Sequence, residues 1–249
     1  SSAFTKIIPL DSEHNSIYRL LHDSNENYKS ITITASGGPF LNKGESFLKK
    51  VKPEQAIKHP IWKMGKKISV DSATMMNKAL EIIEAKYLFN LENNQINAII
   101  HPESIVHASV NYNNGISICL LSRPQMKIPI SYLFFNSTIQ SKAIKDFEFT
   151  SQKTLTFRKI NTDQFPSIKL CYKVLSIGGL APHIFNYANE ILVMKFLDNK
   201  INFLDIVKYN KITIEKFFKK NVNIKNPNIE DIMKTSEWID RNIYLGKKI

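Results

Sequence analysis

The sequence predicts an α/β fold with α+β character in its first part and a small all-α helical bundle in its second part. Strand-like and helix-like segments alternate up to about residue 135, whereas after Pro166 the apolar residues recur at helical spacing. A hydrophobic content of 43% is enough to build packed cores and excludes a disordered chain.

The first part contains several short segments with the alternation of a β-strand. Residues 6–10 predict a short strand that ends in an acidic loop at 11–14. Residues 30–35 (SITITA) alternate apolar and polar side chains and stop at Ser-Gly-Gly-Pro. Further strands are predicted at 67–70, 98–101, 108–111 and 116–121, with a hairpin turn at 113–115 between the last two.

Helical spacing is found once before residue 135 and dominates after residue 166. The first predicted helix covers 72–90, and the later ones cover 167–176, 182–199, 201–219 and 229–244, with Gly178-Gly179 as a stop signal. These segments predict a first domain over 1–136, a linker over 137–165 and a helical domain over 166–249.

Charge and composition limit the classes of partner. The net charge of +12 favours an anionic partner such as a phosphorylated substrate, but no five like charges are consecutive, which disfavours a nucleic-acid track. Two cysteines exclude a cysteine-based zinc site, and no apolar run is long enough to span a membrane. The eight glycines form neither a dinucleotide-binding nor a P-loop motif.

The predicted helix at 72–90 has two faces. Its apolar face consists of Met76, Leu80, Ile83 and Tyr87. Its polar face consists of Thr74, Asn77, Lys78, Glu81 and Glu84. With Ser72 as the expected N-cap, this polar face suits a phosphate at a helix N-terminus, and the alternative is a solvated face with ordinary i,i+4 pairs.

Asp11 and Glu13 lie two residues apart at a predicted strand end. Together with Glu81 they would form an all-oxygen site, which suits a hard divalent cation such as Mg²⁺ or Mn²⁺. The alternative interpretation is an acidic surface loop.

Five segments carry a resemblance to a known family. They are 9–15 (PLDSEHN), 35–40 (ASGGPF), 59–78 (HPIWKMGKKISVDSATMMNK) followed by Leu80-Glu81, 100–104 (IHPES) with His107, and 186–190 (NYANE). In this order they strongly resemble 1-deoxy-D-xylulose 5-phosphate reductoisomerase. The match extends over nearly the whole chain, and only the part beyond about residue 201 is generic.

The resemblance implies an NADPH- and metal-dependent isomerisation and reduction of 1-deoxy-D-xylulose 5-phosphate to 2-C-methyl-D-erythritol 4-phosphate, in the non-mevalonate isoprenoid pathway. The implied metal ligands, for Mn²⁺ or Mg²⁺ and also Co²⁺, are Asp11, Glu13 and Glu81, with Lys78 and His59 as further catalytic residues. The implied substrate-binding residues are Ser12, Ser36, His59, Trp62, Ser72, Asn77 and Lys78.

Other residues receive supporting roles from the same resemblance. A flap around 59–66 carries Trp62 and would close on the substrate. Met64 and Met126 would touch the nicotinamide, His14 and His107 would support the site, and Glu84 would lie behind the metal ligands.

The family also has an N-terminal Rossmann domain that binds most of the NADPH. Because the eight glycines of this sequence form no dinucleotide-binding motif, we expect that this domain is missing here. The chain is therefore expected to be the C-terminal portion of a longer enzyme. The resemblance further implies a homodimer, inhibition by phosphonohydroxamates, no nucleic-acid or membrane partner, and a location in a plastid-like organelle or a bacterial cytoplasm.

Three other hypotheses compete with this one. A basic nucleic-acid-binding module would need basic residues and aromatics on one face. A degenerate binding protein would have kept the fold without activity. A metal-independent hydrolase would use Asp11 and Glu13 as acid and base, but it would leave Glu81 and the phosphate-binding set unexplained.

Overall fold

The computed structural model describes residues 7–22, 27–62, 64–135, 144–152 and 154–243, and it divides into two compact units. The sheet unit comprises 1–36 and 84–160, and the helical unit comprises 37–83 and 161–249. The domain boundaries predicted from the sequence stay a prediction. Residue 6 of the first predicted strand, residues 137–143 and 153 of the predicted linker, and residue 244 of the last predicted helix lie outside the described residues.

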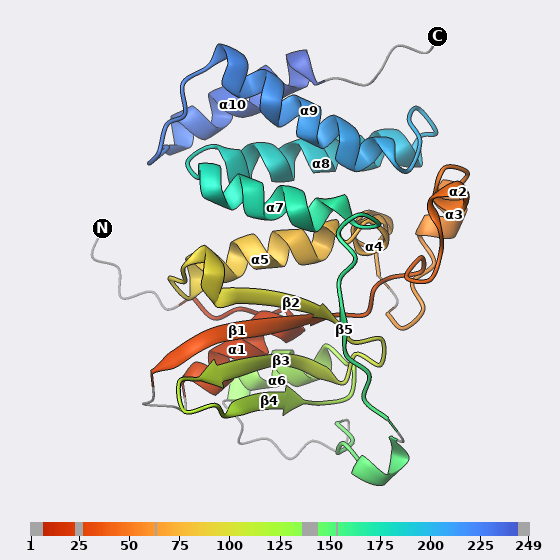
Figure 1. Ribbon diagram of the computed structural model, residues 1–249, viewed down its shortest axis with the longest axis vertical. Coiled ribbons are helices and arrows are strands. Elements are labelled where there is room, and N and C mark those ends of the chain that lie inside the picture. Colours follow the sequence, from red (N-terminus) through yellow and green to blue (C-terminus); the bar gives the residue numbers. More distant parts are fainter. Residues whose placement is uncertain (1–6, 23–26, 63, 136–143, 153, 244–249) are drawn as a thin grey trace. The chain divides into compact units, whose positions relative to one another are not determined.

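The sheet unit is built on five strands in the order β4-β3-β1-β2-β5 (Figure 1). These strands are β1 (Tyr28–Ala35), β2 (Ile96–Ile100), β3 (Val106–Tyr112), β4 (Ser117–Leu121) and β5 (Arg158–Lys159). β1 pairs in parallel with β2 and antiparallel with β3, while β3 and β4 form the predicted hairpin. The short β5 pairs antiparallel with β2 and so attaches the end of the predicted linker to the sheet.

Helix α1 (Ser12–His22) packs against β1, β3 and β4, and α6 (Lys127–Phe135) lies next to α1. The alternating side chains of β1 explain this layer, because Ile31 and Ile33 are fully buried on one face of the strand. Two short 3-10 helices, η1 (Asn93–Gln95) and η2 (Phe149–Ser151), complete the unit.

The helical unit consists of the following elements: α2 (Glu45–Leu48), α3 (Pro53–Ala56), α4 (Lys66–Ala73), α5 (Met76–Leu88, from Glu84 on part of the sheet unit), α7 (Pro166–Ile177), α8 (Ala181–Leu197), α9 (Asp205–Lys220) and α10 (Ile229–Asn242). Helix α8 is central, since it packs against α4, α7, α9 and α10. Its apolar side chains Ile184, Phe185, Leu192 and Phe196 are almost completely buried. The predicted stop after α7 is confirmed, since Gly178 has a φ of 65°.

The structure corrects several local expectations. Residues 67–70 form part of α4 rather than a strand, because the alternation in a four-residue segment is too short to distinguish the two. The predicted helix at 72–90 is two helices separated at Thr74 and Met75, and Met75 has a left-handed φ of 58°. Ser72 therefore lies in the last turn of α4 and is not an N-cap.

Two further expectations were wrong. Residues 7–10 form no strand, and the predicted acidic loop is the beginning of α1. Tyr87 is 60% exposed and does not belong to the apolar face of α5. None of the described helices combines the length and the apolar character needed to cross a membrane.

Candidate functional site

Asp11 occupies the position immediately before α1 and caps its first turn. Its Oδ1 accepts a hydrogen bond from the backbone N–H of His14 at 2.6 Å, as an N-cap side chain does. Its Oδ2 lies 2.5 Å from Nδ1 of the same His14, whose side chain is 1% exposed. Both carboxylate oxygens are thus held by one residue, while the Asp11 side chain remains 37% exposed.

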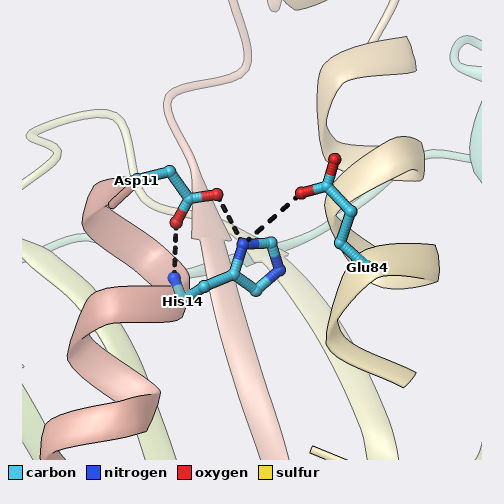
Figure 2. A group of neighbouring side chains, drawn as sticks. All are labelled: Asp11, His14 and Glu84. Atoms are coloured by element: carbon cyan, nitrogen blue, oxygen red, sulfur yellow. Dashed lines mark hydrogen bonds and ion pairs between the residues drawn. The ribbon is translucent and has the colours of Figure 1, made fainter. Parts of the chain in front are cut away.

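Glu84 joins this pair from α5. Its Oε2 lies 3.6 Å from Nδ1 of His14, and Figure 2 shows that the imidazole lies between the two carboxylates. One potential ligand atom from each of Asp11, His14 and Glu84 lies within 4.8 Å of the others. Among the described residues, this is the one group of at least three His, Cys, Asp or Glu side chains whose potential ligand atoms lie this close together.

Glu13 follows Asp11 by two residues and accepts a hydrogen bond from Ser12 Oγ at 2.5 Å. The side chains at this end of α1 offer carboxylate oxygens, which are the ligands that a hard divalent cation prefers. The carboxylate of Asp11 is oriented by His14 and is partly exposed. The structure brings Asp11 together with His14 and Glu84. Glu81, the third predicted ligand, belongs to the helical unit.

Glu81 is the centre of a buried polar cluster on α5. Its Oε2 forms an ion pair with Lys78 Nζ, and its Oε1 accepts a hydrogen bond from Asn77 Nδ2 at 2.5 Å. The Lys78 and Glu81 side chains are only 4% and 8% exposed. This burial excludes a solvated surface pair at Lys78 and Glu81, whereas Glu84 on the same predicted face is exposed. Because burying an ion pair is costly, such a pair is typical of a functional site or a specific structural contact.

His59 organises the backbone that precedes α4. Its Nδ1 accepts hydrogen bonds from the backbone N–H of Ile61 at 3.1 Å and of Trp62 at 2.9 Å. An Nδ1 that accepts is unprotonated, so the neutral ring carries its proton on Nε2. Burial lowers the pKa of His59, which favours the same neutral form. The ring thus holds Trp62 in a fixed turn, and residue 63 of the predicted flap lies outside the described residues.

The loop after β1 approaches α4 closely. Gly38 has a φ of 65°, and a Cβ at this position would lie 2.7 Å from the backbone oxygen of Ser72. Only glycine permits both the conformation and the approach. This contact brings the loop at Gly38 against the last turn of α4, which carries Ser72.

The remaining predicted residues are distributed over both units. His107 is buried on β3, and its Nε2 lies 2.9 Å from Ser122 Oγ. Met64 is half-buried in the helical unit, and Met126 is 38% exposed in the sheet unit. No contact among the described residues tests the predicted role of Met64 and Met126 toward a nicotinamide.

Sequence reasoning missed the buried polar contact between Asp71 and Asn189. Asn189 Nδ2 donates to Asp71 Oδ1 at 2.8 Å, and both side chains are buried. The signal was present in the motifs at 59–78 and 186–190, which contain these two polar residues. Their separation of 118 positions concealed the pairing.

Comparisons with known proteins agree on one family. The 1-deoxy-D-xylulose 5-phosphate reductoisomerase C-terminal domain model matches residues 7–89, and the DXP reductoisomerase C-terminal domain model matches 121–242. A relative named 1-deoxy-D-xylulose 5-phosphate reductoisomerase from Anaplasma phagocytophilum is 48% identical over 82% of this chain and 53% of its own. One of the same name from a Sulfurihydrogenibium species is 42% identical over 99% of this chain and 64% of its own.

Solved structures show the same likeness. A DOX-P reductoisomerase in complex with NADPH, fosmidomycin and magnesium matches with a TM-score of 0.84 and 35% identity, over 94% of this chain and 61% of that one. The reductoisomerase from Zymomonas mobilis in complex with NADPH matches with a TM-score of 0.82 and 36% identity, over 92% and 59%.

The chain spans between about half and two thirds of the length of these relatives. The two domain models together match most of its residues, and the relatives and structures extend the match through nearly all of it. The chain belongs to the 1-deoxy-D-xylulose 5-phosphate reductoisomerase family.

Proposed function

We propose that the protein containing this chain catalyses the isomerisation and reduction of 1-deoxy-D-xylulose 5-phosphate to 2-C-methyl-D-erythritol 4-phosphate with NADPH and a divalent cation. The observation that carries this proposal is the buried cluster of Asn77, Lys78 and Glu81 on α5. These residues stand in the motif at 59–81 by which the chain resembles the family. Burial of this cluster is expected for a site that binds an anionic substrate away from water.

In this proposal the cation is held by Asp11, Glu13 and Glu81. The oriented carboxylate of Asp11 supports this assignment in the sheet unit, and the oxygens of Glu81 support it in the helical unit. When bound, the cation would polarise the substrate oxygens and NADPH would supply the hydride. We place Mg²⁺ first, with Mn²⁺ and Co²⁺ as substitutes, since a solved relative is in complex with magnesium.

The substrate phosphate is assigned to five residues whose side chains can donate hydrogen bonds. This set consists of Ser36, His59, Ser72, Asn77 and Lys78, and Ser12 and Asn77 would also contact substrate hydroxyls. The approach of Gly38 to the Ser72 backbone places the loop at Gly38 next to the last turn of α4, which supports Ser72 as a member of this set. Trp62 would close over the substrate and exclude water, with Met64 and Met126 next to the nicotinamide.

Several properties of the whole protein follow as proposals. We expect a homodimer, inhibition by phosphonohydroxamates such as the fosmidomycin present in one solved relative, and no nucleic-acid or membrane partner. The bacterial relatives favour a bacterial cytoplasm, and a plastid-like organelle is the alternative.

The test is NADPH oxidation dependent on 1-deoxy-D-xylulose 5-phosphate, measured with Mg²⁺ and Mn²⁺ on the longest natural protein that contains this chain. Glu81→Gln should reduce turnover more than 100-fold, because it removes a ligand charge. Glu84→Gln is the matched control one helical turn later and should retain most activity. An inactive, folded wild-type protein would refute the reaction, and equal losses in the two variants would refute the ligand assignment.

A further inference from the structure

A buried polar contact links α4 to α8 within the helical unit. Asp71 Oδ1 accepts a hydrogen bond from Asn189 Nδ2 at 2.8 Å, and Asp71 Oδ2 pairs with Lys67 Nζ at 2.8 Å. The Asp71 side chain is 2% exposed and Asn189 is completely buried. Because each oxygen of a buried carboxylate is costly to leave without a partner, α8 supplies the partner of Oδ1 while Lys67 of α4 supplies that of Oδ2.

Helix α7 holds the same stretch of chain at two further points. Ser167 Oγ donates to the backbone oxygen of Thr74 at 2.7 Å, and Cys171 Sγ donates to that of Ala79 at 3.1 Å. Together with the contact at Asp71, these bonds bracket residues 72–78. The two C-terminal helices therefore restrain the segment that carries three of the residues assigned to the substrate phosphate.

This segment requires restraint because of its backbone conformation. Met75 has a φ of 58°, in the left-handed region that is unfavourable for a residue with a side chain. Such a conformation persists only where the surroundings impose it. The turn between α4 and α5 is held by hydrogen bonds of its own Thr74, whose Oγ1 accepts from the Met76 backbone N–H, and by the contact from Ser167 of α7.

We infer that Asn189 is a positioning residue for the phosphate site: it fixes Asp71 and thereby orients the neighbouring Ser72 and the turn that leads to Asn77 and Lys78. This inference rests on the proposed function. Since hydrogen bonds to a phosphate weaken with shifts of a few tenths of an ångström, loss of the Asn189 contact should act on substrate affinity.

The experiment compares Asn189→Ala with Asn210→Ala in the longest natural protein. Asn210 is the matched control, because it is equally buried and donates from Nδ2 to a helix carbonyl, that of Phe185, at 2.8 Å. In both residues Oδ1 has no hydrogen-bond partner among the described residues. Both variants should lose similar stability. Only Asn189→Ala should raise the KM for 1-deoxy-D-xylulose 5-phosphate, by about tenfold, with kcat changed less than about threefold.

A second measurement separates this inference from the reaction itself. Inorganic phosphate should raise the melting temperature of the wild type and of Asn210→Ala, and it should raise that of Asn189→Ala markedly less. This result would support the inference even in a protein without reductoisomerase activity. Equal shifts and equal KM values in the two variants would overturn it. The inference would also be overturned if the wild type is active but inorganic phosphate does not raise the melting temperature of Asn210→Ala.

A third comparison covers the case in which Asn189→Ala does not fold. Asp71→Asn keeps an acceptor for Asn189 Nδ2, whereas Asp71→Ala removes it. Asp71→Asn should therefore raise KM less than Asp71→Ala does. An equal increase in both would show that the hydrogen bond to Asn189 does not orient the site.

Discussion

The beginning of α1 and the beginning of α5 hold their carboxylates with the same local spacing but in different surroundings. At α1, Asp11 pairs with His14 three residues later, and its side chain is 37% exposed. At α5, Lys78 pairs with Glu81 three residues later, and the two side chains are 4% and 8% exposed. The spacing is encoded locally in both. The energetic consequence depends on burial, since water reaches the Asp11 carboxylate of the first pair and is excluded from both members of the second.

The largest expected effect tests the buried pair. Lys78→Met should lower the free energy of unfolding by about 3 to 5 kcal/mol, because it leaves the Glu81 charge buried without its cation. The double variant Lys78→Met/Glu81→Leu should regain most of that stability and remain inactive. Chemical denaturation and the NADPH assay measure both properties.

The control is the exposed i,i+4 pair of Lys49 with Glu45, whose side chains are 64% and 72% exposed. Lys49→Met should change stability by less than about 0.5 kcal/mol. A loss in Lys78→Met no larger than this would show that the pair on α5 is screened by water like the exposed one.

A smaller effect separates capping from metal binding at α1. Asp11→Ala should cost about 1 kcal/mol of stability, whereas Asp11→Asn should cost less than about half of that, because asparagine is an equally good N-cap. Asp11→Asn should nevertheless weaken Mn²⁺ binding at least tenfold, since it removes a ligand charge. Calorimetric titration with Mn²⁺ checks this, and unchanged Mn²⁺ affinity would limit Asp11 to a structural role.

The third prediction concerns pH and the turn at Trp62. The pKa of His59 is lowered by burial from its ordinary 6.5, so its stabilising contribution is present above about pH 6.5 and is lost as pH falls through the lower native value. Protonation of Nδ1 would break both hydrogen bonds to the backbone. Trp62 fluorescence, recorded in a Trp238→Phe background, should titrate in this range.

The control is His59→Asn, whose Oδ1 can accept the same backbone hydrogen bonds without titrating. The fluorescence transition should disappear in this variant. A transition that persists would assign it to another group.

The smallest expected effect is at Asp71, where burial raises the pKa despite the opposing effects of Lys67 and Asn189. Compared with the unfolded chain, the folded state shifts Asp71 toward its protonated form, so this contribution to stability is present below the unfolded pKa of about 3.8 and is lost as pH rises through the native pKa. Asp71→Asn should therefore gain stability relative to the wild type as pH rises. Unfolding curves from pH 3 to 7 check the sign.

Local sequence pattern was sufficient for the strongly periodic elements. The strand at 30–35, the hairpin at 113–115 and the four C-terminal helices are confirmed within a few residues, because alternation and helical spacing are properties of short windows. Pattern failed at 67–90, where one helix was expected and two are found. No short-range signal marks Met75 for a left-handed conformation, which α7 helps to hold in place through Ser167.

The sequence by itself determined the two-part fold class, the family and the polar residue types at the site, since these depend on periodicity and on motifs that are continuous in the chain. Only the tertiary structure decided that Lys78 and Glu81 are buried and that Asn189 contacts Asp71. The physical reason is that burial and pairing depend on residues from distant elements, whose approach no local window of sequence contains.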